Sequence, residues 1–114
     1  MCSEATLDLV TGKISRAARD VLGDKLEKVY LFGSYARGDY DEESDIDIFV
    51  LADIEPTEAN NIRRKIHRTT GDLDLEYDVV TCIHMGCSSI FHRARNVLPF
   101  YMNILKDGRE LSYA

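Results

Sequence analysis

Apolar residues near the start of the chain recur every three or four positions, which is the spacing of an amphipathic helix. Ser3 stands before this stripe as a candidate N-cap, and Gly23 stands where a left-handed residue commonly ends a helix. The pattern therefore predicts a helix between these two residues, with a buried stripe of Leu7, Val10, Ile14, Ala17 and Val21.

Two short apolar runs then predict buried strands. The first, Val29 to Phe32, ends at Gly33, and the second runs from Ile46 to Leu51. Both are rich in the β-branched and aromatic side chains that pack well on a pleated surface. A third strand is expected from Asp74 to Ile83, where Leu75, Tyr77, Val79 and Thr81 alternate with Glu76, Asp78, Val80 and Cys82.

Proline and glycine mark the remaining helices. Pro56 fits the first turn of a helix that ends near Gly71, residues 88–96 have a helical apolar pattern, and Pro99 opens a last helix that ends near Gly108. The fold class is therefore α/β (α+β), with a small mixed sheet packed against helices. We expect residues 1–114 to form a single domain.

Composition narrows the possible partners. Hydrophobic residues make up 45% of the chain and charged residues 30%, as in an ordinary globular protein. The net charge of −6 argues against non-specific nucleic-acid binding, which depends on a basic surface. Cys2, Cys82 and Cys87 lack the spacing of a zinc site, and no apolar run reaches the roughly 20 residues that span a bilayer. We expect a cytoplasmic protein with reduced thiols and no membrane contact.

The stretch LFGSYARGDYDEESDIDIFV, residues 31–50, places two acids inside an apolar strand. Because side chains alternate along a strand, Asp45 and Asp47 point to one face while Ile46, Ile48 and Val50 point to the other. Two carboxylates about 7 Å apart repel each other, and a hard divalent cation such as Mg²⁺ would relieve that repulsion. The alternative is that both acids lie on the solvent face of an edge strand.

Gly33 and Ser34 precede these acids, followed by a predicted helical turn from Tyr35 to Arg37. Glycine lets the backbone approach a ligand closely, and backbone N–H groups at such a turn can bind an anion. A glycine-serine turn alone is more often a plain turn. Beside a carboxylate pair, it indicates a phosphate site.

Gly33-Ser34, ten intervening residues and Asp45-x-Asp47 resemble the motif of the DNA polymerase β-like nucleotidyltransferase superfamily. The string GSYARGDYDEESDIDIFV resembles minimal nucleotidyltransferases (MNT), the antitoxins of modules whose toxin is a HEPN-domain ribonuclease, and VLPFYMNILKDGREL resembles their C-terminal segments. The resemblance covers nearly the whole chain. It implies a polymerase β-like nucleotidyltransferase core.

The resemblance also implies roles for individual residues. Asp45 and Asp47 would hold two Mg²⁺ ions, and Gly33 and Ser34 would bind the β- and γ-phosphates of ATP. Arg37 would either contact phosphate or pair with an acid such as Asp39 or Asp45.

The superfamily usually adds a third carboxylate from a neighbouring strand, which binds metal and accepts a proton. Asp78 is the choice here, because DVV resembles the family's acid followed by an apolar strand, and Glu76 is the substitute. The alternative for Asp78 is an ordinary residue at the strand start, too far from the other acids. His67, His84 and His92 are expected to be structural or surface residues.

The implied activity is transfer of AMP from ATP to a hydroxyl, a tyrosine of the cognate HEPN toxin. One alternative is an antibiotic-type small-molecule transferase, in which a homodimer would supply the missing second domain. Another is an antitoxin that neutralises by binding alone. The basic run Arg63, Arg64, Lys65 and Arg68 is either a solvated face or a contact with a partner or tRNA.

Overall fold

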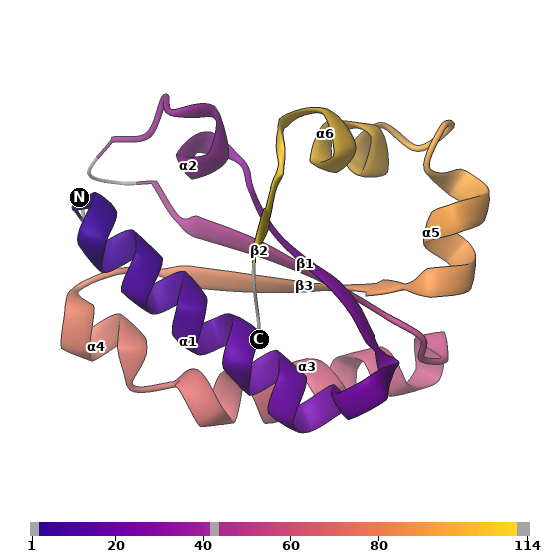
Figure 1. Cartoon of the computed structure of the whole chain (residues 1–114), viewed down its shortest axis with the longest axis horizontal. Coiled ribbons are helices and arrows are strands. Elements are labelled where there is room, and N and C mark those ends of the chain that lie inside the picture. Colours follow the sequence, from indigo (N-terminus) through magenta and orange to yellow (C-terminus); the bar gives the residue numbers. More distant parts are fainter. Residues whose placement is uncertain (1–2, 42–43, 112–114) are drawn as a thin grey trace.

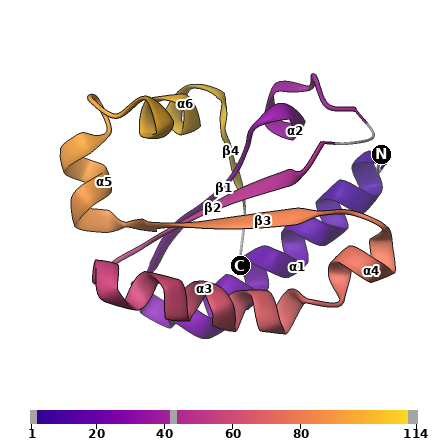
Figure 2. The ribbon, with the colours of Figure 1, turned by 180° about the vertical axis from the view of Figure 1, so that it is seen from behind.

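The computed structural model describes residues 3–41 and 44–111, and it places helices on both sides of one sheet (Figure 1). Helices α1, α3 and α4 cover one face, and α5 and α6 cover the other (Figures 1 and 2). The elements in chain order are α1 (Glu4–Leu22), a 3-10 turn (Gly23–Lys25), β1 (Leu26–Phe32), α2 (Ser34–Arg37), β2 (Ile46–Ala52), α3 (Pro56–Thr70), α4 (Leu73–Tyr77), β3 (Thr81–Cys87), α5 (Ser88–Ala94), α6 (Pro99–Asp107) and β4 (Arg109–Leu111).

The sheet is mixed, with the strand order β3-β2-β1-β4. Strand β1 is antiparallel to both β2 and β4, whereas β2 and β3 are parallel. A parallel pair needs a crossover connection, and α3 and α4 supply it on one face of the sheet (Figure 2). The predicted fold class, a small mixed sheet packed against helices, is confirmed.

The first helix forms where its apolar spacing and caps predict it. The Ser3 hydroxyl accepts a hydrogen bond from the Thr6 N–H at 3.1 Å, which satisfies one of the free donors at the helix start. Gly23, at φ 58°, ends the helix, and its N–H donates to the Arg19 carbonyl. The inward stripe is buried, with Val10 and Ile14 fully so.

Strand β2 lies between two hydrophobic clusters, because its side chains alternate between the faces of the sheet. Ile46, Ile48 and Val50 join the cluster that includes the inward residues of α1 and α3. Phe49 joins the smaller cluster beneath α5 and α6, which also contains Tyr30, Leu51, Phe91 and Ile104. By this alternation Asp47 shares the face of Phe49.

The other predicted helices are confirmed, with small differences at their ends. Helix α3 begins at Pro56 after a capping box in which Glu55 and Glu58 exchange side chain-to-backbone hydrogen bonds. Helix α5 ends at Ala94, slightly before the predicted end at residue 96, and α6 begins at Pro99.

The predicted strand from Asp74 to Ile83 is wrong from Asp74 to Val80. Residues Leu73–Tyr77 form helix α4, and the strand runs from Thr81 to Cys87. The alternation of Leu73, Leu75 and Tyr77 also fits one helical turn, because residues four apart share a helix face. In the structure the shared helix face of Leu73 and Tyr77 points inward: Leu73 is buried and Tyr77 half-buried, while Leu75 is 89% exposed.

Strand β4 was not predicted, because Arg109–Leu111 is short and mostly polar. It pairs with β1, and Lys28 Nζ lies 3.0 Å from Glu110 Oε2 across the pair. In residues 3–41 and 44–111, no helix is both long and apolar enough to cross a membrane.

Candidate functional site

The turn between β1 and α2 brings the backbone close to the strand next to it. Gly33 has φ 75°, a left-handed conformation that favours glycine, and its carbonyl accepts from the N–H groups of Ala36 and Arg37 at 3.1 Å. Gly38, at φ 86°, ends the turn, and its N–H donates to the Ser34 carbonyl at 2.9 Å. The helical turn predicted after Gly33 is confirmed.

Asp47 lies against this turn. Phe32 is the register partner of Asp47, so Gly33 follows directly beside the carboxylate. A Cβ added to Gly33 would lie 2.5 Å from Asp47 Oδ2, closer than real Cβ contacts allow. Gly33 is therefore required here for two reasons, its backbone conformation and the closeness of the carboxylate. The structure brings together these two residues, which the sequence pattern had paired.

Asp45 lies close to Asp47 and contacts Cys82 of the neighbouring strand β3. Cys82 is the register partner of Asp47 on that strand, and its thiol lies 3.7 Å from Asp45 Oδ2. On the side of Asp47 away from Gly33, its Oδ1 lies 3.7 Å from His84 Nε2 of β3. Asp45, Asp47, Cys82 and His84 therefore gather where β2 begins.

Two members of this cluster, Asp47 and Cys82, have a raised pKa. Burial raises the pKa of Asp47 above its ordinary value of 3.8, and the negative charge of Asp45 raises it further, although His84 and Arg37 act in the opposite direction. Burial also raises the pKa of the Cys82 thiol, and the charges of Asp45 and Asp47 add to that rise. Two carboxylates of this kind attract a hard divalent cation, whose remaining ligands would come from water and phosphate oxygens.

The other predicted phosphate-binding residues lie on α2. Ser34 is the first residue of this helix and is half-buried. Arg37 ends it, and its Nε lies 3.3 Å from Asp39 Oδ2 at an exposed position. The structure thus contains the pairing with Asp39 that the sequence left open, while the positive charge of Arg37 still lowers the pKa of Asp47.

Asp78 and Glu76 do not lie on the strand that motivated their selection. Glu76 is within α4, and Asp78 ends that helix in a left-handed conformation at φ 53°. Among the described residues, no group of three or more His, Cys, Asp or Glu side chains could hold a metal ion, so Asp78 does not complete a set with Asp45 and Asp47. The role of Asp78 as the third carboxylate stays a prediction, but the strand position on which that prediction was based is wrong.

Sequence reasoning missed Cys82 and His84 as members of this cluster. Their strand was expected to end at Ile83, which left His84 outside it. The stretch TCIHM, residues 81–85, gives little strand signal, because it lacks the regular apolar alternation by which strands are recognised. The pairing of β2 with a parallel strand could have identified them, because the strand beside Asp47 must place one side chain next to its carboxylate.

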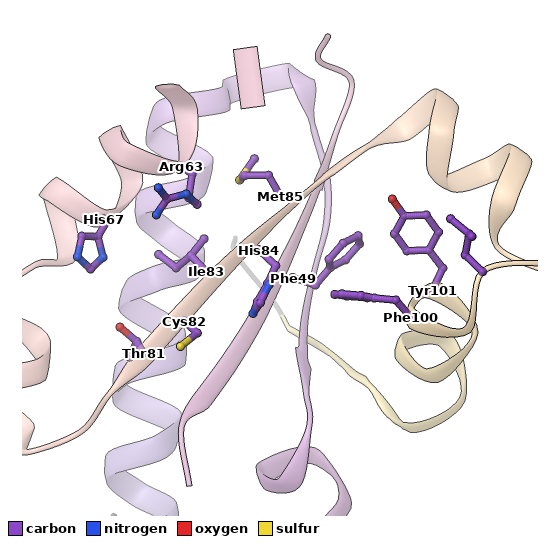
Figure 3. Close-up of a pocket in the computed structure, with 11 residues that line it drawn as sticks. Phe49, Arg63, His67, Thr81, Cys82, Ile83, His84, Met85, Phe100 and Tyr101 are labelled. Atoms are coloured by element: carbon purple, nitrogen blue, oxygen red, sulfur yellow. The ribbon is translucent and has the colours of Figure 1, made fainter. Parts of the chain in front are cut away.

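Two cavities are lined by neighbours of Asp47, one by Gly33 and the other by His84. The first, about 250 Å³, lies on the Gly33 side; we name it the glycine cavity, and it is lined by Phe32, Gly33, Arg37, Phe100, Asn103 and Asp107. The second, about 670 Å³, lies on the His84 side along β3 (Figure 3). We name it the edge groove, and it is lined by Phe49, Arg63, His67, Thr81–Met85, Leu98, Phe100 and Tyr101.

Comparison with known proteins identifies relatives of the chain. The model of the nucleotidyltransferase domain family matches residues 13–110. A protein of Methanocaldococcus jannaschii named for a proposed protein adenylyltransferase activity, MJ0141, is 48% identical over 60 residues, which are 53% of this chain and 59% of that protein. A second, MJ0604, is named in the same way and is 38% identical over 87 residues, 76% of this chain and 79% of that protein.

Solved structures show the same fold. A crystal structure of a toxin-antitoxin with AMP-PNP is 27% identical, has a TM-score of 0.56, and is matched over 90% of this chain and 72% of that chain. A toxin-antitoxin structure of MntA-HpeT, 24% identical with a TM-score of 0.55, covers 90% of this chain and 71% of that chain and supports the fold alone. The predicted resemblance to the minimal nucleotidyltransferases is thereby confirmed.

Proposed function

Because the chain belongs to the nucleotidyltransferase domain family, we propose that it transfers AMP from ATP to a hydroxyl group of a partner protein. The partner is a toxin with a HEPN domain, and the acceptor is a tyrosine. The observation that carries this proposal is the contact between Gly33 and Asp47, which joins a phosphate-binding turn to a carboxylate pair. The toxin-antitoxin relatives and the names of the archaeal relatives support the kind of partner.

In the proposed reaction, the acceptor oxygen attacks the α-phosphorus of ATP. An oxygen–phosphorus bond forms to AMP, the bond from the α-phosphorus to the bridging oxygen of the β-phosphate breaks, and pyrophosphate leaves. The hydroxyl proton passes to solvent. The chain contributes position and charge: Gly33 and Ser34 hold the outer phosphates, and Arg37 offsets their negative charge.

Asp45 and Asp47 would hold two Mg²⁺ ions in this account. The carboxylates fit hard cations because they are oxygen donors that lie close together. Burial, and to a smaller extent the charge of Asp45, raises the pKa of Asp47, so a cation would stabilise its charged form. Bound Mg²⁺ would stabilise the charge that develops on the attacking and leaving oxygens. In the absence of Mg²⁺, burial and the nearby charge of Asp45 raise the pKa of Asp47 and so favour its protonation.

Mass spectrometry of a co-expressed partner tests the proposal. The product of the gene adjacent to this one is expressed with the wild-type chain and with the Asp45→Asn or Asp47→Asn variant. We expect the partner to gain the mass of one or more AMP groups with the wild-type chain and none with either variant. Asp53→Asn is the matched control, because Asp53 is an exposed acid just beyond the far end of β2.

A second candidate function is neutralisation of the toxin by binding alone. The observation that favours it is the lack, among the described residues, of a third carboxylate beside Asp45 and Asp47. The same experiment separates the two functions. Suppression of toxicity by the wild type and by both Asn variants, with no change in the mass of the partner, would establish binding alone.

A further inference from the structure

The edge groove follows the outer edge of β3 rather than one face of the sheet. It is lined by five consecutive residues, Thr81–Met85, whose side chains point alternately to opposite faces. Only a cavity along the edge itself can contact all five. Figure 3 shows the same arrangement, with Arg63 and His67 of α3 on one side of β3 and Phe100 and Tyr101 of α6 on the other.

On its outer edge, β3 has backbone N–H and carbonyl groups that can pair with another strand. The Val80 carbonyl accepts from the Ile46 N–H on the β2 side, so Thr81, Ile83 and Met85 direct their backbone groups outward. The Thr81 N–H donates to Asp74 Oδ2 at 3.4 Å. Within the described sheet β2 is the only strand beside β3. The backbone groups of Ile83 and Met85 therefore point into the groove, where a further strand could pair with them.

We propose that the edge groove is the acceptor site, and that its occupant is an extended, acidic segment of the partner polypeptide that pairs with the outer edge of β3. Addition of a strand to an exposed sheet edge is a recurring mode of peptide recognition. The inference rests on the proposed function and specifies how that site receives its acceptor. The acceptor hydroxyl reaches Asp47 from the His84 side, while the nucleotide occupies the glycine cavity.

The position of Asp47 supports this division. Its Oδ2 lies beside Gly33, which lines the glycine cavity, and its Oδ1 lies 3.7 Å from His84, which lines the edge groove. In-line transfer requires the attacking oxygen and the leaving pyrophosphate on opposite sides of the α-phosphorus. An acceptor in the edge groove and phosphates beside Gly33 meet that requirement.

The charges of the groove indicate an acidic occupant. The side chains that α3 contributes to the lining are the bases Arg63 and His67, and no acid is among the lining residues. Asp45 and Asp47 lie behind the lining residues Cys82 and His84, at the end where the acceptor hydroxyl would react. The Arg63 guanidinium is hydrogen-bonded to the amide oxygen of Asn60 at 3.0 Å, a neutral partner that leaves its positive charge in place. This basic lining stands out in a chain with a net charge of −6.

Exposed apolar residues beside the groove favour a polypeptide over a small metabolite. The described large apolar side chains that remain exposed are concentrated in one segment, Val97, Leu98, Phe100, Met102 and Leu105. Leu98 and Phe100, exposed by 44% and 40%, also line the groove. A surface of this kind, continuous with the groove, is typical of a protein-binding site.

Synthetic peptides test the proposal with the whole chain, ATP and Mg²⁺. The probe is a short peptide with one tyrosine flanked by valine and glutamate; a second peptide has lysine in place of glutamate, and a third has the acidic sequence with N-methyl groups on alternate backbone nitrogens. We expect the acidic peptide to gain AMP about tenfold faster than the lysine peptide, and N-methylation to abolish the gain.

Charge reversal on α3 supplies the matched variants. Arg63→Glu should lower kcat/KM for the acidic peptide about tenfold and improve the lysine peptide, whereas Arg64→Glu, on an exposed residue outside the groove, should change both less than about twofold. Equal use of the two charged peptides, an unchanged preference in Arg63→Glu, or full modification of the N-methylated peptide would overturn the proposal.

Two further outcomes separate this inference from the proposed function. If no peptide is modified while the full-length partner still gains AMP, the edge groove is not the acceptor site, and the proposed function stands. If neither the peptides nor the partner gain AMP, the proposed function fails and the inference fails with it.

Discussion

At the scale of the residue, the site depends on how closely Asp47 and Gly33 approach. The carboxylate is held between the left-handed turn and His84, and its burial next to Asp45 makes the charged form costly without a cation. These contacts make two substitutions informative. One tests the space beside the carboxylate, and the other tests its charge.

Gly33→Ala should remove transfer activity. The added methyl group meets Asp47 Oδ2, and a displacement of the carboxylate by about 1 Å can lower a rate about a hundredfold. The left-handed backbone adds a stability cost of about 1 to 2 kcal/mol. AMP incorporation and the free energy of unfolding measure the two effects.

Gly38→Ala is the matched control for this substitution. Gly38 has φ 86°, and a Cβ there meets no atom within 4 Å. It should therefore lose stability through its left-handed backbone alone and keep its activity when assayed below its melting temperature. Equal losses of activity in the two variants would mean that the contact with Asp47 is unimportant.

Asp47→Asn should increase stability at neutral pH in the presence of EDTA. The pKa of Asp47 is higher in the folded chain than its ordinary value of 3.8, so between these values the folded state binds more protons than the unfolded state. The wild type therefore loses stability relative to the variant as the pH rises through this window. Below pH 3.8 the difference should fade, because both states are protonated.

Denaturant unfolding of both proteins from acid to neutral pH measures this difference. A variant that is less stable than the wild type at neutral pH, by a margin that shrinks in acid, would show that Asp47 is stabilised in its charged form by its surroundings. The raised pKa would then be wrong.

At the scale of the element, β2 and the turn before it were predictable, whereas α4 and the bounds of β3 were not. The run from Ile46 to Leu51 is apolar on both faces, which suits a strand between two layers. The segment from Leu73 to Tyr77 satisfies the periods of both a strand and a short helix. Tertiary contacts decide between them: Asp74 accepts from the Thr81 hydroxyl at 2.8 Å, which ties α4 to the start of β3.

Asp78→Gly tests this corrected assignment. Asp78 is left-handed at φ 53°, so glycine should raise the free energy of unfolding by about 0.5 to 1 kcal/mol. In a strand the same change would lower it. AMP transfer, measured on the same variant, tests the predicted third carboxylate: retained activity would exclude Asp78 from that role, and a stable but inactive variant would establish it.

At the scale of the whole molecule, the fold brings residues from three separate segments to one place. The turn at Gly33 comes from the end of β1, the acids from the start of β2, and Cys82 and His84 from a parallel strand that follows two helices. The motif around Gly33 and Asp47 could be predicted because its residues are close in sequence. The edge groove could not, because it depends on the register between β2 and β3 and on the position of α6.

Nucleotide binding should stabilise the molecule only when Mg²⁺ is present. AMP-PNP at about 100 times its dissociation constant should raise the melting temperature by roughly 10 °C, because it binds the folded state alone. Asp45→Asn should remove most of this shift, and EDTA should do the same to the wild type. An equal shift in EDTA would show that the carboxylate pair does not hold a metal needed for nucleotide binding.

The most direct test of the central claim is to follow which phosphate of ATP reaches the acceptor protein. The wild-type chain is incubated with Mg²⁺ and its partner, in parallel reactions with ATP labelled at the α- or the γ-phosphate. The account predicts incorporation of the α label alone, release of pyrophosphate, and loss of both in Asp47→Asn. Incorporation of the γ label, or α-label incorporation that persists in Asp47→Asn, would contradict it.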